Sequence, residues 1–402
     1  TCFGGETVRA TIGDSVEYVE QREQLGTGHA VLQTKELLAK ERGTIMVLCG
    51  DTPLLTAELL ARFHEEHVQS RAKATVLTAI MPNAKGYGRI IRHESGEVLK
   101  IVEHKDATEE ERKIREINAG IYCFDAQALF SALAKVTNDN AQGEYYLPDV
   151  LGILRDAGEK IWAVVADNYE STLGINSRSQ LAVAERILRR RKVEELMADG
   201  VTIMDPHTTF IDAEVHVGMD TVIYPFTFLE GVTVIGEDCC IGPHVRFQNT
   251  VVGDGVKAHY VYAHDADVES GTDLGQFNHI RPDSHLGAGV KLGNFVEVKN
   301  SDIGAGSKLP HLSYIGDCDM GEHVNMGCGT ITVNYDGRNK FRTVIGDNAF
   351  VGCNSNLVAP VALGEDSYVA AGSTITRDVP AGTLAVARAR QKEIEGWRDK
   401  RR

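Results

Sequence analysis

The sequence predicts two domains, an α/β domain followed by a parallel β-helix. The second half of the chain places an apolar residue at every sixth position from Ile211 to Phe247, and this spacing returns further along. Such an interval fits neither the 3.6-residue period of an α-helix nor the two-residue period of a single strand, so it indicates a coil whose turns stack apolar side chains. The first half instead alternates strand-like apolar runs with polar or helical stretches, which is typical of an α/β sheet.

The six-residue repeat extends through most of the second half. Its apolar positions are Ile211, Val217, Ile223, Leu229, Ile235, Ile241 and Phe247, then Val268, Leu274, Ile280, Leu286, Leu292, Val298, Ile303, Leu309, Ile315, Met320 and Met326, and finally Ile345, Val351, Leu357, Leu363, Val369 and Ile375. Glycine often follows the apolar position, which suits tight corners where φ can be positive and a Cβ would clash.

Four strand-like runs mark the predicted sheet of the first half, at residues 44–50, 75–80, 98–104 and 161–166. A helix is expected over 56–69, with Thr56 able to cap its first turn. A charged helix over 178–200 would join the two domains. The predicted division is an α/β domain at 1–177, a connecting helix at 178–200, a β-helix at 201–383 and a tail at 384–402.

Composition excludes several classes of protein. Forty-two basic against 57 acidic side chains give a net charge of -15, which argues against a general nucleic-acid-binding or anionic-membrane surface. We expect no transmembrane or secretory segment. The eight cysteines include no C-x-x-C pair, so we expect reduced thiols in a cytoplasmic protein. Because the chain starts at Thr1 in mid-pattern, we also expect a fragment of a longer protein.

Residues near the ends of the predicted strands are candidate ligand contacts. Asp51 follows the run 45–50, at the edge where open α/β sheets bind ligands, so its carboxylate could bind a metal or cap the next turn. Asn176, before the long helix, fits a ligand contact or a helix cap. The glycine-rich segments 25–30 and 86–90 fit nucleotide contacts or ordinary turns.

Seven motifs, in order, carry a resemblance to one enzyme family. They are 21-QREQLGTGHA-30, 49-CGD-51, 86-GYGRI-90, 102-VEHKDAT-108, 116-EINAGI-121, 142-QGEYY-146 and 173-LGINSR-178. With the hexapeptide repeat that follows, they resemble the bifunctional uridylyltransferase and acetyltransferase of bacterial UDP-N-acetylglucosamine synthesis over nearly the whole chain. This resemblance implies a Rossmann-like nucleotidyltransferase domain, a left-handed β-helix and a homotrimer.

The resemblance implies a uridylyl-transfer site in the first domain. Its contacts would be Gln21, Gly26 and Thr27 for the uracil end of UTP, Asp51 and Asn176 for Mg²⁺, and Gly88, Glu103, Asn118 and Tyr146 for N-acetylglucosamine 1-phosphate. Mg²⁺ suits two oxygen ligands together with phosphates. The sugar phosphate oxygen would attack the α-phosphorus of UTP in line, so positioning and charge neutralisation matter most.

The opening of the chain departs from the family pattern. The family begins with a strand and a loop of the form L-x-x-G-x-G-T-x-M, and no such segment precedes Gln21 here. We therefore expect an N-terminally truncated sheet, and little uridylyltransferase activity in this chain, because the loop amides that stabilise the triphosphate would be absent. Missing sequence is preferred to evolved loss as the reason. Pro148 is a smaller departure near the sugar contacts.

The resemblance also implies an acetyl-transfer site in the β-helix. Its glucosamine 1-phosphate contacts would be Arg281, Lys299 and Lys340 at the phosphate, and Tyr314, Asn325 and Tyr335 around the sugar. Three cations suit one dianion. His311 would be the general base, with Glu297 orienting it or stabilising its cation and Asn334 assisting. The segment 327–342, which interrupts the repeat, is either part of this site or a tolerated insertion.

Acetyl-CoA would lie between neighbouring subunits. The resemblance implies contacts from Cys328, Cys353, Ala371 and Arg388. Two alternatives remain: another sugar 1-phosphate nucleotidyltransferase whose β-helix only oligomerises, and a non-catalytic scaffold like some translation exchange-factor subunits. His311 and the N-Y-D-G loop argue against the first alternative, and the retained sugar and phosphate contacts argue against the second.

Overall fold

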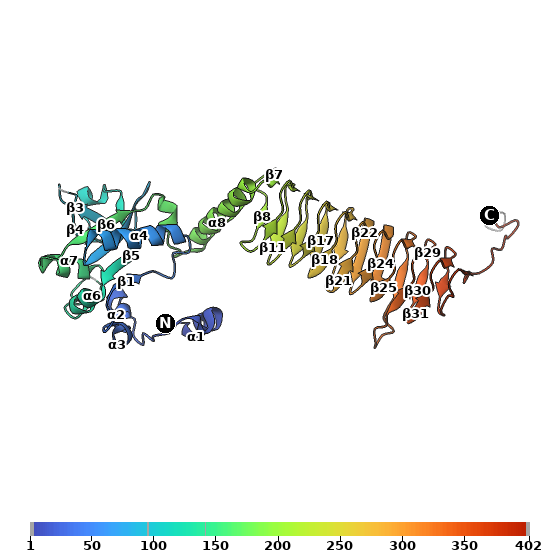
Figure 1. Cartoon of the computed structure of the whole chain (residues 1–402), viewed down its shortest axis with the longest axis horizontal. Coiled ribbons are helices and arrows are strands. Elements are labelled where there is room, and N and C mark those ends of the chain that lie inside the picture. The colour runs from blue at the N-terminus through green and yellow to red at the C-terminus, as the bar shows by residue number, and fades with distance from the viewer. Residues whose placement is uncertain (1–3, 95, 141, 399–402) are drawn as a thin grey trace. The chain divides into compact units, whose positions relative to one another are not determined.

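The computed structural model describes residues 4–94, 96–140 and 142–398 and forms two compact units, Thr1–Ile187 and Leu188–Arg402 (Figure 1). The helix α8 (Arg178–Ala198) is divided between them. None of the helices in the described residues is long and apolar enough to cross a bilayer. Seven cysteines lie in the described part as free thiols, and Cys2 lies outside it.

A six-stranded mixed sheet forms the centre of the first unit, with the order β4-β3-β5-β2-β6 and β1 paired to β5. Its strands are β1 (Thr44–Val47), β2 (Ala74–Ile80), β3 (Arg89–Arg92), β4 (Val98–Val102), β5 (Glu116–Asp125) and β6 (Ile161–Val165). Strands β2 and β6 run parallel, whereas β5 is antiparallel to β1, β2 and β3.

The first unit also contains short helices. They are α1 (Gly5–Ile12), α2 (Thr27–Leu32), α3 (Lys35–Leu38), α4 (Ala57–Ser70), α5 (Glu109–Arg112), α6 (Ala126–Leu133) and α7 (Asp149–Asp156), with 3-10 turns η1 (Gly13–Ser15) and η2 (Tyr169–Thr172). The predicted cap of α4 is present, because the Thr56 side chain accepts the Leu59 N–H at 3.3 Å. Apolar side chains of α6 and α7 pack with β2 and β5 in one core.

The strand predicted over 44–50 is shorter and more exposed than expected. It ends at Val47, and its four residues are half-buried. In the described part of the chain β1 pairs only with β5, so its second edge has no neighbouring strand. Asp51 therefore lies in the turn beyond the strand, after a loop of three residues.

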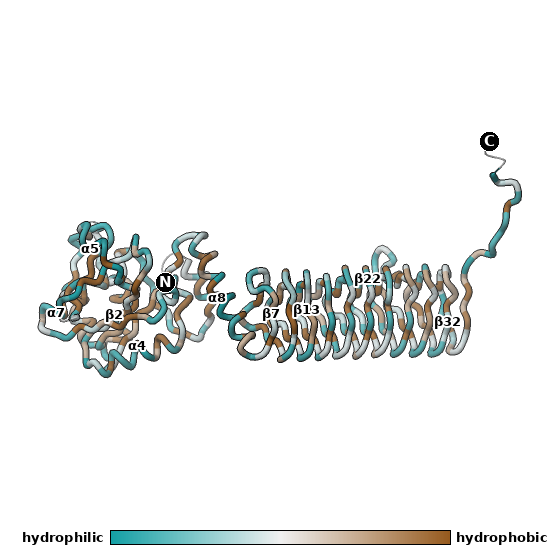
Figure 2. Tube along the Cα trace, turned by 90° about the horizontal axis from the view of Figure 1, so that it is seen from above, coloured by the Kyte–Doolittle hydropathy of each residue, from teal (hydrophilic) through white to brown (hydrophobic). Residues whose placement is uncertain are grey.

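A left-handed β-helix forms the second unit, as predicted, from β7 (Thr202–Ile203) to β34 (Leu384–Ala385). Its strands pair in parallel, coil on coil, and Figure 1 shows them stacked in sequence order. Ile223 stacks on Ile241, and Val351 stacks on Val369, so residues of the six-residue repeat meet in register. These side chains form one continuous buried core, and Figure 2 shows hydrophobic stretches recurring along the coils.

The glycines that follow the apolar positions are required mainly by close stacking, not by positive φ. A Cβ on Gly218 would lie 2.6 Å from the Gly236 carbonyl carbon of the next coil, and a Cβ on Gly352 would lie 2.5 Å from the Ala371 nitrogen. Positive φ falls largely on other corner residues, such as Asp317 (φ 50). The predicted clash is therefore correct, whereas the expected positive φ is found at Gly242 (φ 102) and not at Gly218 or Gly352.

Candidate functional sites

The residues predicted to bind glucosamine 1-phosphate come from successive coils. Strands β20 (Asn278–Ile280), β22 (Lys291–Lys299) and β24 (Lys308–Gly316) stack so that His279, Glu297 and Tyr314 are in register. Arg281 and Lys299 each lie two residues further along their own coils. The two cations therefore project from adjacent coils.

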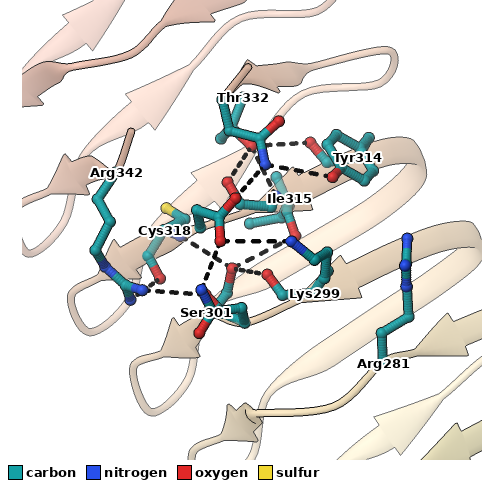
Figure 3. A network of polar contacts seen from close by, with 12 residues as sticks. Arg281, Lys299, Ser301, Tyr314, Ile315, Cys318, Thr332 and Arg342 are labelled. Atoms are coloured by element: carbon teal, nitrogen blue, oxygen red, sulfur yellow. Dashed lines mark hydrogen bonds and ion pairs between the residues drawn. The ribbon is translucent and has the colours of Figure 1, made fainter. Parts of the chain in front are cut away.

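Ion pairs hold both cations. The Arg281 guanidinium donates to Glu297 Oε1 at 3.0 Å, and the two side chains are each 39% exposed. Lys299 Nζ lies 3.6 Å from Asp317 Oδ1, and both of these side chains are largely buried. Figure 3 shows Lys299 at the edge of this polar network and Arg281 beside it.

The segment predicted to interrupt the repeat is an ordered loop. Asn325 in β26 (Asn325–Met326) stacks on Phe350 of the next coil, so this coil is 25 residues long, whereas Ile223 and Ile241 are 18 apart. Tyr335 and Lys340 form an antiparallel bridge within the loop, and Asp336 accepts two backbone N–H groups at its tip.

Arg342 fastens the end of this loop by an ion pair with Asp319. Lys340 therefore stands on a loop anchored at both ends, close enough to Lys299 for that ammonium to lower the pKa of Lys340.

His311 lies exposed on β24, three residues before Tyr314, and its backbone carbonyl accepts the Ser313 hydroxyl at 2.9 Å. The residue in register with it on β22 is Asn294. Glu297 is in register with Tyr314 and its carboxylate binds Arg281, and among the described residues no hydrogen bond or ion pair joins Glu297 to His311. The orienting role of Glu297 stays a prediction.

Asn334 is 8% exposed and lies against Tyr314, whose hydroxyl oxygen is 3.4 Å from Asn334 Nδ2. The same amide nitrogen donates to Asp317 Oδ2. Sequence reasoning missed Asp317. A signal was available, because Asn300, Asp317 and Asn334 follow one another at intervals of 17 residues.

The predicted acetyl-CoA contacts line up along the last coils. Met326 stacks on Val351 and Val351 on Val369, and Cys328, Cys353 and Ala371 each lie two residues after these. Arg388 Nη1 donates to the Ala371 carbonyl at 2.9 Å, which brings the fourth predicted residue to the same line. Cys328 is half-buried and Cys353 exposed, so this line faces solvent in the single chain.

The first unit contains a cavity of about 690 Å³ that holds four of the predicted nucleotide and sugar contacts. They are Thr27, Glu103, Asn118 and Tyr146. Pro148 also lines this cavity, close to the predicted sugar contacts, as does Cys49. Burial, and then the charges of Asp106 and Asp149, raise the pKa of Glu103.

Gly88 and Gly26 do not line this cavity, but each is confined by close neighbours beside residues that do. A Cβ on Gly88 would lie 3.0 Å from Glu103 Oε1, and the Gly88 carbonyl accepts the Asn118 N–H at 2.9 Å. Gly26 has φ 106, and a Cβ there would lie 2.6 Å from the Tyr145 carbonyl oxygen. Gln21 Nε2 donates to the Gly26 carbonyl at 3.2 Å, so the predicted uracil contacts are grouped.

Asp51 and Asn176 meet around Gly174. A Cβ on Gly174 would lie 3.3 Å from Asp51 Oδ2 and 4.0 Å from Asn176 Nδ2, and the Asp51 carbonyl accepts the Ile175 N–H at 2.9 Å. One carboxylate and one amide fit Mg²⁺, which keeps waters and substrate phosphates as its other ligands. Within the described residues, no group of three or more His, Cys, Asp or Glu side chains forms an all-protein metal site.

A family model matches residues in each half of the chain. Residues 6–174 match the nucleotidyl transferase family, and residues 342–377 match the bacterial transferase hexapeptide family. The bifunctional protein GlmU of Geobacillus sp. (strain WCH70) is 54% identical over 398 residues, which cover 99% of this chain and 87% of that protein. The chain belongs to the GlmU family.

A second GlmU, from Brevibacillus brevis, is 54% identical over 96% of this chain and 84% of its own length. A solved UDP-N-acetylglucosamine acyltransferase from Francisella novicida matches at 15% identity and a TM-score of 0.28 over 46% of this chain and 67% of that one, which is too low to support an argument. Membership of the GlmU family confirms the predicted bifunctional transferase of UDP-N-acetylglucosamine biosynthesis. The near-full coverage does not bear out the predicted lack of an N-terminal segment.

Proposed function

We propose that the second unit transfers the acetyl group of acetyl-CoA to the amine of glucosamine 1-phosphate. The supporting observation is the grouping of Lys299, Lys340 and Arg281 on consecutive coils and one anchored loop, beside the strand that carries His311. A phosphate dianion is the ligand that such a set of cations would bind most strongly.

The proposed reaction requires a base at the sugar nitrogen. The amine attacks the thioester carbonyl, the C–S bond breaks, and CoA leaves as a thiolate that takes up a proton. The proton lost by the nitrogen passes to the imidazole of His311, the side chain suited to this transfer near neutral pH. Tyr314, Asn325, Asn334 and Tyr335 would hold the sugar.

The line formed by Cys328, Cys353 and Ala371, with Arg388 beside it, would hold acetyl-CoA along the coils. A groove with a single wall leaves much of such a long cofactor in water. A neighbouring copy of the chain would supply the second wall, so the proposed enzyme is a homotrimer.

An exposed apolar ridge supports self-association. Phe226, Tyr260, Phe277, Phe295 and Leu312 lie at one corner of the coils, with His244 on the coil between the first two, and these five apolar residues are 37% to 61% exposed. The five rings from Phe226 to Phe295, His244 included, contact one another in sequence, with 5.1 Å between the centroids of Phe277 and Phe295. Such a continuous exposed apolar stripe is typical of a protein interface.

In the first unit we propose transfer of a uridylyl group from UTP to N-acetylglucosamine 1-phosphate, at the low rate expected above for a chain in which no L-x-x-G-x-G-T-x-M segment precedes Gln21. A phosphate oxygen of the sugar attacks the α-phosphorus, and pyrophosphate leaves. Gln21, Gly26 and Thr27 would hold the uracil end, and the remaining cavity residues the sugar. Asp51 and Asn176 would hold Mg²⁺, which supplies charge neutralisation at the triphosphate. We place both activities in the cytoplasm.

Two assays test these proposals. Free thiol release from acetyl-CoA with glucosamine 1-phosphate should be catalytic, and a His311→Ala variant should lose about 10²- to 10⁴-fold in kcat while keeping its uridylyltransferase activity. No thiol release by the unmodified chain would favour the scaffold alternative. Uridylyl transfer without acetyl transfer would favour the alternative of a nucleotidyltransferase with an oligomerising β-helix.

A further inference from the structure

A buried carboxylate of the second unit has no part in the reaction described above. Asp317 follows β24 and is only 4% exposed. Its Oδ1 accepts a hydrogen bond from Asn300 Nδ2 at 2.5 Å and lies 3.6 Å from Lys299 Nζ, and its Oδ2 accepts one from Asn334 Nδ2. A buried charge is costly unless it is paired and hydrogen-bonded, and this one has partners on both oxygens.

Stacking of the coils produces this arrangement. Asn300 lies one coil before Asp317 and Asn334 one coil after it, so the carboxylate is bonded to an amide on each side. The Asn334 amide nitrogen is occupied by Asp317 and by the Tyr314 hydroxyl. With its nitrogen held in this way, the amide is fixed in one orientation and its oxygen is left for other partners.

Two ammonium groups lie near this carboxylate. Lys299 pairs with it from β22 at 3.6 Å, and Lys340, on the loop, forms no ion pair with it within 4.0 Å but is near enough for its charge to lower the pKa of Asp317. The nearby Lys299 ammonium lowers the pKa of Lys340, whereas the charges of Asp317 and Tyr314 raise it. Two like charges this close are stable only with a negative charge beside them.

We propose that Asp317 is a positioning residue of the acetyl-transfer site, which holds Lys299 and Lys340 together as a seat for the substrate phosphate and fixes the amide of Asn334. This inference rests on the acetyl-transfer function proposed above. Asp317 acts through its neighbours. It balances the two ammoniums before the phosphate arrives.

The charged groups around Asp317 determine how this role depends on pH. They are Lys299 on β22, Tyr314 on β24, and Lys340 and Arg342 at the loop. Burial raises the pKa of Asp317, but the hydrogen bonds from Asn300 and Asn334 and the charges of the two lysines outweigh it and leave that pKa below its usual value. Asp317 is therefore ionised throughout the neutral and alkaline range.

An Asp317→Asn variant tests the proposal through the pH dependence of KM for glucosamine 1-phosphate. Near pH 7 the variant has one negative charge fewer near the phosphate, so the phosphate is repelled less. This gain offsets part of the loss caused by lysines that are no longer held in place, so KM should stay within about threefold of the parent value. Towards pH 9 Lys340, whose pKa the Lys299 ammonium already lowers, loses its proton earlier once the charge of Asp317 is removed. One ammonium–phosphate contact is then lost, and KM should exceed the parent value by about tenfold or more.

The ratio of the two KM values is the quantity to follow, since ionisations of the substrate cancel in it. Asparagine tolerates the left-handed backbone at this position, where φ is 50, and Asp317→Gly suits it too, so Asp317→Gly serves as a second variant if the first does not fold. Asp302→Asn is the matched control. It removes an exposed carboxylate that pairs with His285 on the other sheet, and its ratio should stay constant.

The outcomes separate this inference from the function on which it rests. If the parent chain releases no thiol, the acetyl-transfer function itself is rejected. An active parent chain with a KM ratio for Asp317→Asn that does not change from pH 7 to pH 9 would overturn the role of Asp317, since a purely structural defect acts equally at every pH. A ratio that rises with pH for Asp317→Asn and stays flat for Asp302→Asn supports it.

Discussion

A methyl group added at Gly316 should disturb the acetyl-transfer site while leaving the coil folded. Gly316 ends β24, and its N–H donates to Thr332 Oγ1 at 2.8 Å. A Cβ there would lie 2.7 Å from Tyr314 Cζ and 2.8 Å from Asn334 Nδ2. Carbon atoms in contact are about 3.5 Å apart or more, so the Tyr314 ring must shift by about 0.8 Å. φ at Gly316 is not positive, so alanine adds no backbone strain.

The shift has a calculable effect on catalysis. A displacement of about 1 Å in a reacting or positioning group can cost on the order of 100-fold in rate, so we expect kcat/KM for glucosamine 1-phosphate to fall by about ten- to 100-fold in Gly316→Ala. Overpacking costs about 1–3 kcal/mol where neighbours cannot move. Tyr314 is half-buried and not enclosed in the apolar core, so the loss of stability should lie at the lower end.

Thiol release, measured with the thermal unfolding midpoint of the same sample, checks this prediction. Uridylyl transfer by the first unit serves as an internal control for protein concentration and folding. A kcat/KM within twofold of the parent chain would show that Tyr314 and Asn334 are not held where the chemistry needs them. A large fall in the unfolding midpoint would instead show that the added methyl group displaces the backbone of the coil and not only the Tyr314 side chain.

Three further predictions concern metal, packing and charge. Chelation of divalent ions should abolish uridylyl transfer and leave thiol release unchanged, and Asp51→Asn should raise the Mg²⁺ concentration needed for half-maximal uridylyl transfer. Thr233→Val should cost about 1–3 kcal/mol in a denaturant titration, because the fully buried Thr233 hydroxyl accepts the Thr250 N–H at 3.2 Å and donates to Glu230 O at 2.7 Å. Glu103→Gln should stabilise the first unit at pH 7. Since the folded pKa of Glu103 is raised, its contribution is fully present below the unfolded value of about 4.5 and is lost as pH rises from there through the folded pKa, so the variant should flatten this part of the stability profile.

The β-helix was predictable because its interior stacks apolar side chains, with small hydroxyl residues such as Thr233 between them. Hexad residues such as Leu274 and Leu292 meet in register, so one regular pattern reports both the strands and their pairing. The first unit gave a weaker signal. Strands β3 and β5 were not identified, because Arg89 and Asn118 place polar groups within them and remove the simple alternation.

Residues of the candidate site were predictable where the residue type suits a direct role, such as a base or a phosphate contact. A residue that acts only through its neighbours was not predictable. His311 and Lys299 stand in family-like motifs. Asp317 follows a glycine at a corner, where aspartate is common for its tolerance of positive φ, so nothing in its local sequence marks it. Its partners lie a full coil away on either side and become visible only when the coil length is known.

Coil length also explains how a narrow prism can carry a polar site at all. Most coils take 16 to 18 residues, as in the pairs Val251 with Asp267 and Ile223 with Ile241. The coil from Asn325 to Phe350 takes 25, yet Met326 still stacks on Val351 within the apolar core. Because the added residues leave at a corner, they disturb no interior contact. They can therefore bring an ammonium and a tyrosine over the preceding coils, a position that no residue of a regular coil could reach.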